Sequence, residues 1–129
     1  MTLRRVLQPP RAAVADGGGM LTPEWGEFFR DVVTRLSLDI KAKSADYTAT
    51  VADEVFLVDA TAGAVTVTLP SVSRLAGKSY TIKKTDASAN AVTIDGDGSE
   101  TIDGAATQSL ASQWDSVTVV SDGSGWYIV

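Results

Sequence analysis

The sequence predicts a mainly β protein, in which a β-sandwich or barrel-like domain over residues 44–129 follows an extended N-terminal arm and one short α-helix. Two observations predict the β-domain. From about residue 46 the hydrophobic period is two, and glycines separate runs rich in threonine and valine at intervals of about 8–12 residues. Many short strands at this spacing favour a sandwich or barrel over an α/β fold.

Residues 1–20 are predicted to form the arm, because Pro9-Pro10 fixes extended backbone and Gly17-Gly18-Gly19 favours flexibility. The first fifteen residues contain three arginines and no acidic residue, which suits an acidic partner. We expect this segment to become ordered only on another protein, as an anchor. The predicted anchoring residues are Leu3, Arg4, Arg5, Val6, Leu7 and Arg11.

Residues 21–43 are predicted to hold a helix and a connector, with the helix over residues 22–37. Thr22 can cap the first turn, and Pro23 suits the first helical position. Apolar residues recur at spacings of three and four, which indicates one apolar face. This face could pack on the chain's own β-domain or form a bundle seam with copies from other chains. The residues of the predicted seam are Trp25, Phe29, Val32 and Leu36.

The β-domain is predicted to begin at residue 44. The predicted strands are Tyr47–Val51, Glu54–Asp59, Ala64–Leu69, Ser79–Lys84, Ala91–Asp95, Glu100–Ile102, Thr107–Leu110, Ser116–Ser121 and Trp126–Val129. In the third of these, Val65 and Val67 share one face, and Thr66 and Thr68 share the other. The last strand is apolar on both faces, so we expect it to lie between two sheets or against another subunit.

Composition restricts the chemistry that is open to the chain. The 129 residues include no cysteine and no histidine, which excludes disulfides, thiol catalysis, histidine-dependent triads and zinc sites built from those ligands. We therefore predict no enzymatic activity and no cofactor. Residues 44–129 carry four basic and eleven acidic residues, within a net charge of −5 for the whole chain. An acidic body of this kind is poorly suited to nucleic acid.

No apolar run reaches the roughly 18–20 residues that cross a bilayer, so no membrane insertion is predicted. The Arg4-Arg5 pair is followed by a proline-containing stretch rather than by the apolar core of a signal peptide. We therefore expect the chain to be made and kept in a cytoplasm.

One acidic run, one repeated tetrapeptide and two tryptophans stand out within the predicted β-domain. The run Asp95–Glu100 resembles a calcium loop in composition, but its spacing departs from the EF-hand pattern, and we interpret it as a turn between strands. Thr93–Gly96 recurs as Thr101–Gly104, which we interpret as two similar strand endings. Trp126 alternates with an apolar residue and is predicted to lie in the core. Trp114 stands beside a turn and is a candidate contact for a sugar ring, with core or subunit contact as the alternative.

The order of several motifs resembles a known class of module. The runs that carry the resemblance are Ala62–Pro70, Ala76–Lys84, Asn90–Asp95, Glu100–Gly104 and Gly123–Tyr127, with the helix start Thr22-Pro23-Glu24-Trp25 before them. This order is similar to β-rich modules in virion proteins of tailed bacteriophages and related gene transfer agents, chiefly fibres and spikes. The resemblance covers roughly residues 20–129 and brings no catalytic residue with it.

The resemblance implies a trimeric projection of a virion that is assembled in the host cytoplasm, on either the tail or the head. The leading hypothesis is a short fibre or spike that binds other virion proteins through its arm and to which a host-surface glycan is a further partner. The second hypothesis is a capsid-decorating protein that cements neighbouring head subunits. The third, from another class, is a soluble carbohydrate-binding module that uses Trp114.

Overall fold

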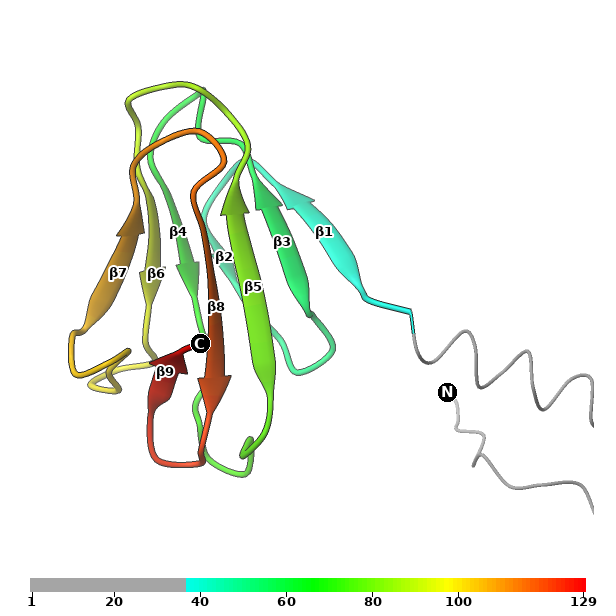
Figure 1. Ribbon diagram of the computed structural model, residues 1–129, viewed down its shortest axis with the longest axis vertical. Coiled ribbons are helices and arrows are strands. Elements are labelled where there is room, and N and C mark those ends of the chain that lie inside the picture. The colour runs from blue at the N-terminus through cyan, green and yellow to red at the C-terminus, as the bar shows by residue number, and fades with distance from the viewer. Residues whose placement is uncertain (1–36) are drawn as a thin grey trace, which may run out of the picture. The chain divides into compact units, whose positions relative to one another are not determined.

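A computed structural model describes residues 37–129 (Figure 1). Within them, Asp39–Val129 form one compact unit that is built from β-strands, and the described residues include no helix. The prediction of a mainly β domain is confirmed. The predicted arm over residues 1–20 and nearly all of the predicted helix lie outside the described residues.

Nine strands of the described region form two sheets. The five-stranded sheet has the order β1-β3-β5-β8-β9, and its strands are Ile40–Lys43, Val55–Val58, Ser79–Lys84, Ser116–Ser121 and Trp126–Ile128. The four-stranded sheet has the order β2-β4-β6-β7, and its strands are Tyr47–Thr48, Val65–Thr68, Val92–Asp95 and Thr107–Leu110. The two sheets face each other across the core (Figure 1). They stay separate, so the sandwich alternative describes the domain and the barrel alternative does not.

The first six strands wind as three stacked coils, because the chain alternates between the two sheets at every strand. β1, β3 and β5 are parallel neighbours, as are β2, β4 and β6. Parallel neighbours need a long crossover, which is usually a helix. Here each crossover is instead a strand of the opposite sheet. β7, β8 and β9 then run antiparallel to their neighbours and complete the sheets.

The core lies between the sheets and follows the alternation of buried and exposed residues along each strand. Its largest side chains form a row of neighbouring rings, with centroid separations of 5.6 Å for Tyr47 and Phe56, 6.3 Å for Phe56 and Tyr80, and 5.5 Å for Tyr80 and Trp126. The Tyr80 hydroxyl donates to the Thr50 carbonyl over 2.8 Å, and burial raises the pKa of Tyr80 to about 12. The prediction of a core position for Trp126 is confirmed, since the residue is fully buried.

Strand β1 lies within residues 21–43, which the sequence analysis assigned to the helix and connector. The compact unit accordingly begins at Asp39, five residues before the predicted boundary at residue 44. β1 lacks the usual strand pattern because Lys41 and Lys43, rather than apolar residues, alternate toward the inner side of the sheet. Because charged residues stand at those positions, the hydrophobic period does not indicate this strand.

Two other predicted strands differ from the structure. Strand β2 ends at Thr48, because the Asp53 carboxylate accepts the Thr50 amide and turns the chain away from the sheet. The prediction of a strand over Glu100–Ile102 is wrong, since Ile102 forms only isolated bridges. There the chain reverses through Asp103 and Gly104, at φ angles of 51° and 82°. The second copy of the Thr-Ile-Asp-Gly motif is therefore a turn, whereas the first copy ends β6.

Candidate functional site

The outer face of the five-stranded sheet is the most unusual surface of the described domain. Along each strand of this sheet, side chains on the outer face alternate with side chains in the core. The strand register aligns the outward side chains in rows across the sheet. The middle row contains Ile40, Val55, Thr81, Thr118 and Val129. Strand pairing defines its first four residues, and the hydrogen bond from the Val129 amide to the Thr118 carbonyl adds the fifth. This row begins and ends with exposed apolar side chains.

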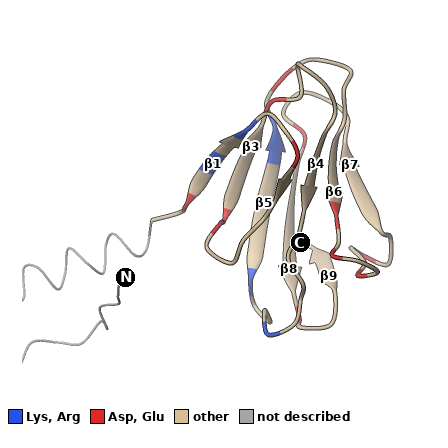
Figure 2. Cartoon of the chain, turned by 180° about the vertical axis from the view of Figure 1, so that it is seen from behind, with Lys and Arg blue, Asp and Glu red and all other residues tan. Residues whose placement is uncertain are grey.

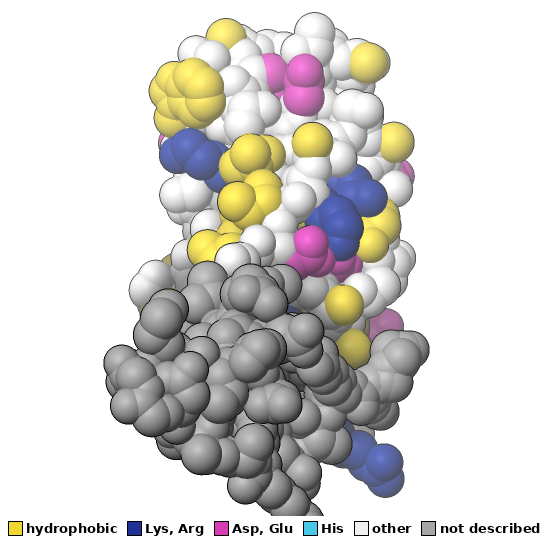
Figure 3. All heavy atoms as spheres, turned by 90° about the vertical axis from the view of Figure 1, so that its right-hand side faces the viewer, with side chains coloured by type: hydrophobic (Ala, Val, Ile, Leu, Met, Phe, Trp, Pro, Cys, Tyr) yellow, Lys and Arg dark blue, Asp and Glu magenta, His cyan; other side chains and the backbone are white. Residues whose placement is uncertain are grey.

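Apolar side chains on this face form two groups. Patch I lies on β1 and β3 and comprises Ile40, Ala42, Val55 and Leu57. Patch II lies on β8 and β9 and comprises Val120, Tyr127 and Val129. Ile40 is 56% exposed and Val129 is 78% exposed, values that are high for apolar side chains. Figure 3 views the domain from the β1 side and shows hydrophobic side chains gathered there beside basic and acidic ones.

Between the two patches the face carries hydroxyl groups that satisfy each other. The Thr81 and Thr118 hydroxyls lie 2.9 Å apart across β5 and β8 and form a hydrogen bond. Because this bond is made within the chain, covering the two threonines would sacrifice little hydrogen bonding to water. This threonine pair is therefore polar in composition but can be buried at small cost.

The strand residues of this face include no acidic residue, although the domain as a whole is acidic. Residues 37–129 carry twelve Asp and Glu against six Lys and Arg, a net charge of −6. Figure 2 shows the acidic residues mainly in loops and at the ends of strands. Lys83, on β5, is the one charged strand residue that this face carries within the described region. The face thus combines apolar side chains with weak local charge.

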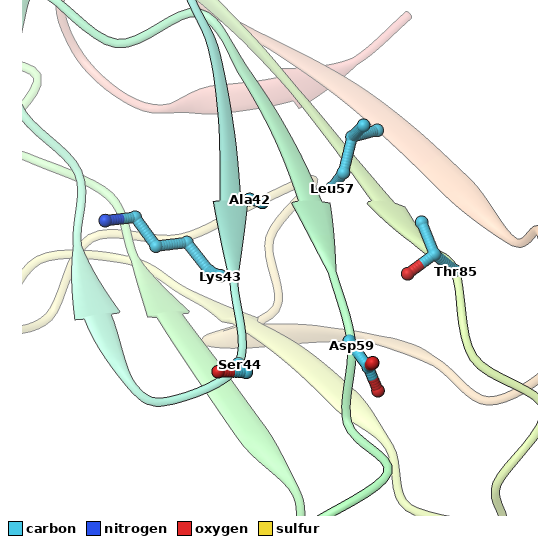
Figure 4. A pocket seen from close by; sticks show the side chains of 6 residues that line it. All are labelled: Ala42, Lys43, Ser44, Leu57, Asp59 and Thr85. Atoms are coloured by element: carbon cyan, nitrogen blue, oxygen red, sulfur yellow. The ribbon is translucent and has the colours of Figure 1, made fainter.

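A shallow depression of about 430 Å³ lies at one end of patch I (Figure 4). It is lined by Ala42, Lys43, Ser44, Leu57, Asp59 and Thr85. Leu57 and Ala42 supply the apolar part of the lining, and Asp59 stands just beyond the end of β3. The hydroxyl and amide of Thr61 hold the pKa of Asp59 below its usual value. The depression is open and holds no convergent set of polar groups.

Trp114 is exposed, as the sugar-contact hypothesis requires, with 58% of its surface accessible. Its backbone has a φ of 73°, a conformation that bulky residues rarely adopt. Two hydrogen bonds hold it there: the Trp114 amide donates to the Lys84 carbonyl over 2.9 Å, and the Lys83 ammonium donates to the Trp114 carbonyl over 3.0 Å. That ammonium also lies 5.8 Å from the centre of the indole ring. The backbone of Trp114 is therefore held by hydrogen bonds, and its indole is exposed near Lys83.

The edge of the sandwich formed by β1 and β2 is closed by side chains. The Lys41 ammonium donates to Asp39 over 2.7 Å and to the buried Asp53 over 2.9 Å, and the Lys43 ammonium lies 3.6 Å from the Tyr47 ring centre. Burial tends to raise the pKa of Asp53, but hydrogen bonds from Lys41, the Thr50 amide and Tyr47 outweigh it and lower that pKa to about 2. Lysines at an edge strand oppose the addition of further strands. The edge is therefore less suited to a partner than the outer face.

Lys84 is the most deeply buried charged residue of the described chain, and its ammonium lies 2.7 Å from the Asp86 carboxylate. Asp86 also accepts the Ala60 amide over 2.7 Å and the amide and hydroxyl of Ser88. The bond from Lys84, with those from Ser88 and Ala60, holds the pKa of Asp86 far below its usual value. This cluster ties the crossover between β5 and β6 to the loop after β3. Lys83 and Lys84 point to opposite faces of the sheet, because neighbouring residues of a strand alternate in direction.

The acidic run Asp95–Glu100 serves the fold. The Glu100 carboxylate accepts the Ser71 hydroxyl over 3.0 Å and the Val72 amide over 3.1 Å, which joins two loops. A side chain at Gly96 would come within 2.3 Å of the Glu100 carbonyl, so glycine is required there. Among residues 37–129, no three potential metal ligands of the Asp, Glu, His or Cys type lie together. The described part of the chain likewise has no helix that is long and apolar enough to span a membrane.

The predicted site residues fall mostly outside the described residues. These are the seam residues Trp25, Phe29, Val32 and Leu36 and the anchoring residues Leu3, Arg4, Arg5, Val6, Leu7 and Arg11. Patch I was not predicted from the sequence, although Val55–Val58 is apolar on both faces, like Trp126–Val129. No family model matches the chain, and no curated protein matches its sequence.

Proposed function

We propose that this chain is a non-catalytic structural protein of a phage-type virion, a short trimeric fibre or spike anchored through residues 1–20. The observation that carries the proposal is that the two ends of the described domain differ in their strand arrangement. Its stacked coils begin at the β1–β2 edge, where the described chain starts, and they finish in the antiparallel strands β7–β9. Such a module is suited to stand at the end of a projection whose base is the N-terminal segment.

The polar groups of the domain support a structural role over a catalytic one. The buried carboxylates of Asp53 and Asp86 are saturated by bonds within the chain, and Glu100 joins two loops. Groups that hold loops together in this way stiffen a module but are not positioned to exchange protons with a substrate. The resemblance to fibre and spike modules leads to the same proposal.

The test is to locate the chain on particles released by the cells that encode it. Electron microscopy is expected to place three copies of the β-domain in each of a small number of projections. A variant lacking residues 2–16 should fold and should be missing from the particles, because it has lost its anchor. Normal incorporation of that variant would show that attachment uses another part of the chain. Absence of the intact chain from the particles would contradict the virion role.

Two alternatives differ from this proposal in measurable ways. A capsid-decorating protein would be present in a copy number that matches the capsid lattice, and imaging would show it between head subunits. A carbohydrate-binding module is favoured by one observation, the exposed indole of Trp114. Titration of the chain with bacterial surface glycans tests it: binding by the intact chain that Trp114→Ala abolishes would support the module.

A further inference from the structure

We infer that the outer face of the five-stranded sheet is an interface between copies of this chain, in which patch I of one copy packs against patch II of the next. Both patches expose apolar side chains that the described chain leaves uncovered. The exposed fraction is 37% for Leu57 and 45% for Tyr127, and it is higher for Ile40 and Val129. The inference rests on the proposed function in that it takes the chain to act as an oligomer.

Charge favours another copy as the occupant of this face. Two domains that each carry a net charge of −6 repel when their acidic surfaces meet, and a contact that avoids acidic residues avoids most of this cost. The strand residues of this face are free of acids, whereas the outer face of the four-stranded sheet carries Asp95. A basic partner would gain more from that other surface than from this one. A second copy, acidic itself, is best accommodated here.

The arrangement of the patches selects the pairing between them. Patch I and patch II flank the bonded Thr81 and Thr118, so they lie on opposite halves of one face. Pairing patch I with patch I would leave patch II exposed on both copies. Pairing patch I with patch II repeats one contact around a ring and covers both patches on every copy. A ring of three copies is the closed form that agrees with the proposed function.

The middle row supplies the test positions. Ile40 and Val129 stand at its two ends, in different patches, and both are mostly exposed, so substitutions there should disturb folding little. The experiment compares full-length wild type, Ile40→Lys, Val129→Glu and the double variant by light scattering and native mass spectrometry across a range of concentrations. Ser109→Lys and Ser109→Glu are the controls, because Ser109 is exposed on the outer face of the four-stranded sheet.

Each single variant is expected to raise the dissociation constant at least about tenfold, because a charge is then buried against an apolar patch. The double variant should return to within about threefold of wild type, since the new lysine and glutamate meet at every contact. The Ser109 variants should keep the wild-type mass. If patch I met patch I instead, the double variant would dissociate at least as readily as the single variants.

Three outcomes would overturn the inference. A trimer that resists both single variants would move the interface away from this face and leave the proposed trimer intact. A wild-type chain that stays monomeric at high concentration would remove the interface and the trimer together. Ile40→Lys would lower the melting temperature without changing the mass if patch I were covered within one chain, and that result would also overturn the inference.

Discussion

The two outer faces of the sandwich have the same geometry and different chemistry. On the four-stranded sheet, the outward strand residues are Thr48, Thr66, Thr68, Thr93, Asp95, Thr107 and Ser109. On the five-stranded sheet, the outward strand residues are Ile40, Ala42, Val55, Leu57, Ser79, Thr81, Lys83, Ser116, Thr118, Val120 and Tyr127, so that apolar residues lie on both sides of a polar centre. Both sets of residues favour strands. The need to form a sheet therefore does not explain the difference, which agrees with the contact between copies that we infer for the five-stranded sheet.

The outer faces are free to differ because the stability of the domain comes mainly from contacts between the sheets. The buried ion pair of Lys84 and Asp86 provides the strongest test of this explanation. Replacing Asp86 with alanine leaves Lys84 charged, buried and without its partner. We expect this change to lower the free energy of unfolding by about 3–5 kcal/mol, measured by urea denaturation. The control is Lys84→Met combined with Asp86→Ala, which should recover most of the loss because no unpaired charge remains. A loss below about 1 kcal/mol for the single variant would contradict the burial of the pair.

Asp53 provides the second test, because it links β1 of one sheet to β2 of the other through Lys41 and Tyr47. Its pKa of about 2 lies below the unfolded value, so its contribution is complete above about pH 5 and is lost as the pH falls toward 2. We expect about 2 kcal/mol of stability to disappear across this range. Asp53→Asn should flatten this part of the profile, measured as the urea midpoint against pH. If the Asp53→Asn variant had the same dependence of the urea midpoint on pH as wild type, the loss of stability at acid pH would come from other carboxylates.

An exchange of isosteric residues between the two outer faces tests whether their chemistry sets self-association. Val55→Thr with Val120→Thr gives the five-stranded sheet the chemistry of the other face, and Thr66→Val with Thr93→Val does the reverse. The first pair should weaken self-association by about tenfold and the second should strengthen it, while each changes the free energy of unfolding by about 1 kcal/mol or less. Sedimentation measures the association and urea denaturation the stability. Equal association by all variants would show that the two faces are equivalent.

The smallest expected effect concerns Trp114, at the margin of the apolar face. Glycine accommodates its φ of 73° without strain, so Trp114→Gly should raise the free energy of unfolding by up to about 1 kcal/mol. Trp114→Ala keeps the strained conformation and loses the contact with Lys83, so it should be less stable than the glycine variant. Thermal denaturation of the two variants compares them. A glycine variant that is less stable than wild type would show that the indole contributes more by its contacts than its backbone costs.

Local residue patterns were sufficient to predict most of the β-domain. In the segment from Val65 to Leu69, alternation alone indicates which residues are buried, because successive side chains of a strand point to opposite faces. The glycines and aspartates between strands indicate where the chain turns. The burial of Trp126 followed from the same alternation. These features depend on neighbours along the chain, and so the sequence by itself determined them.

Only the tertiary structure decided which strands pair and what the charged residues do. Parallel pairing of β1 with β3 joins segments that are separated by a strand of the other sheet, and no pattern within either segment specifies it. The inward position of Lys41 is stable only because Asp53, on a later loop, lies 2.9 Å away. Lys84 is buried for the same reason, beside Asp86. The local pattern indicated where most of the strands are, and contacts between distant segments set their order and which face remains uncovered.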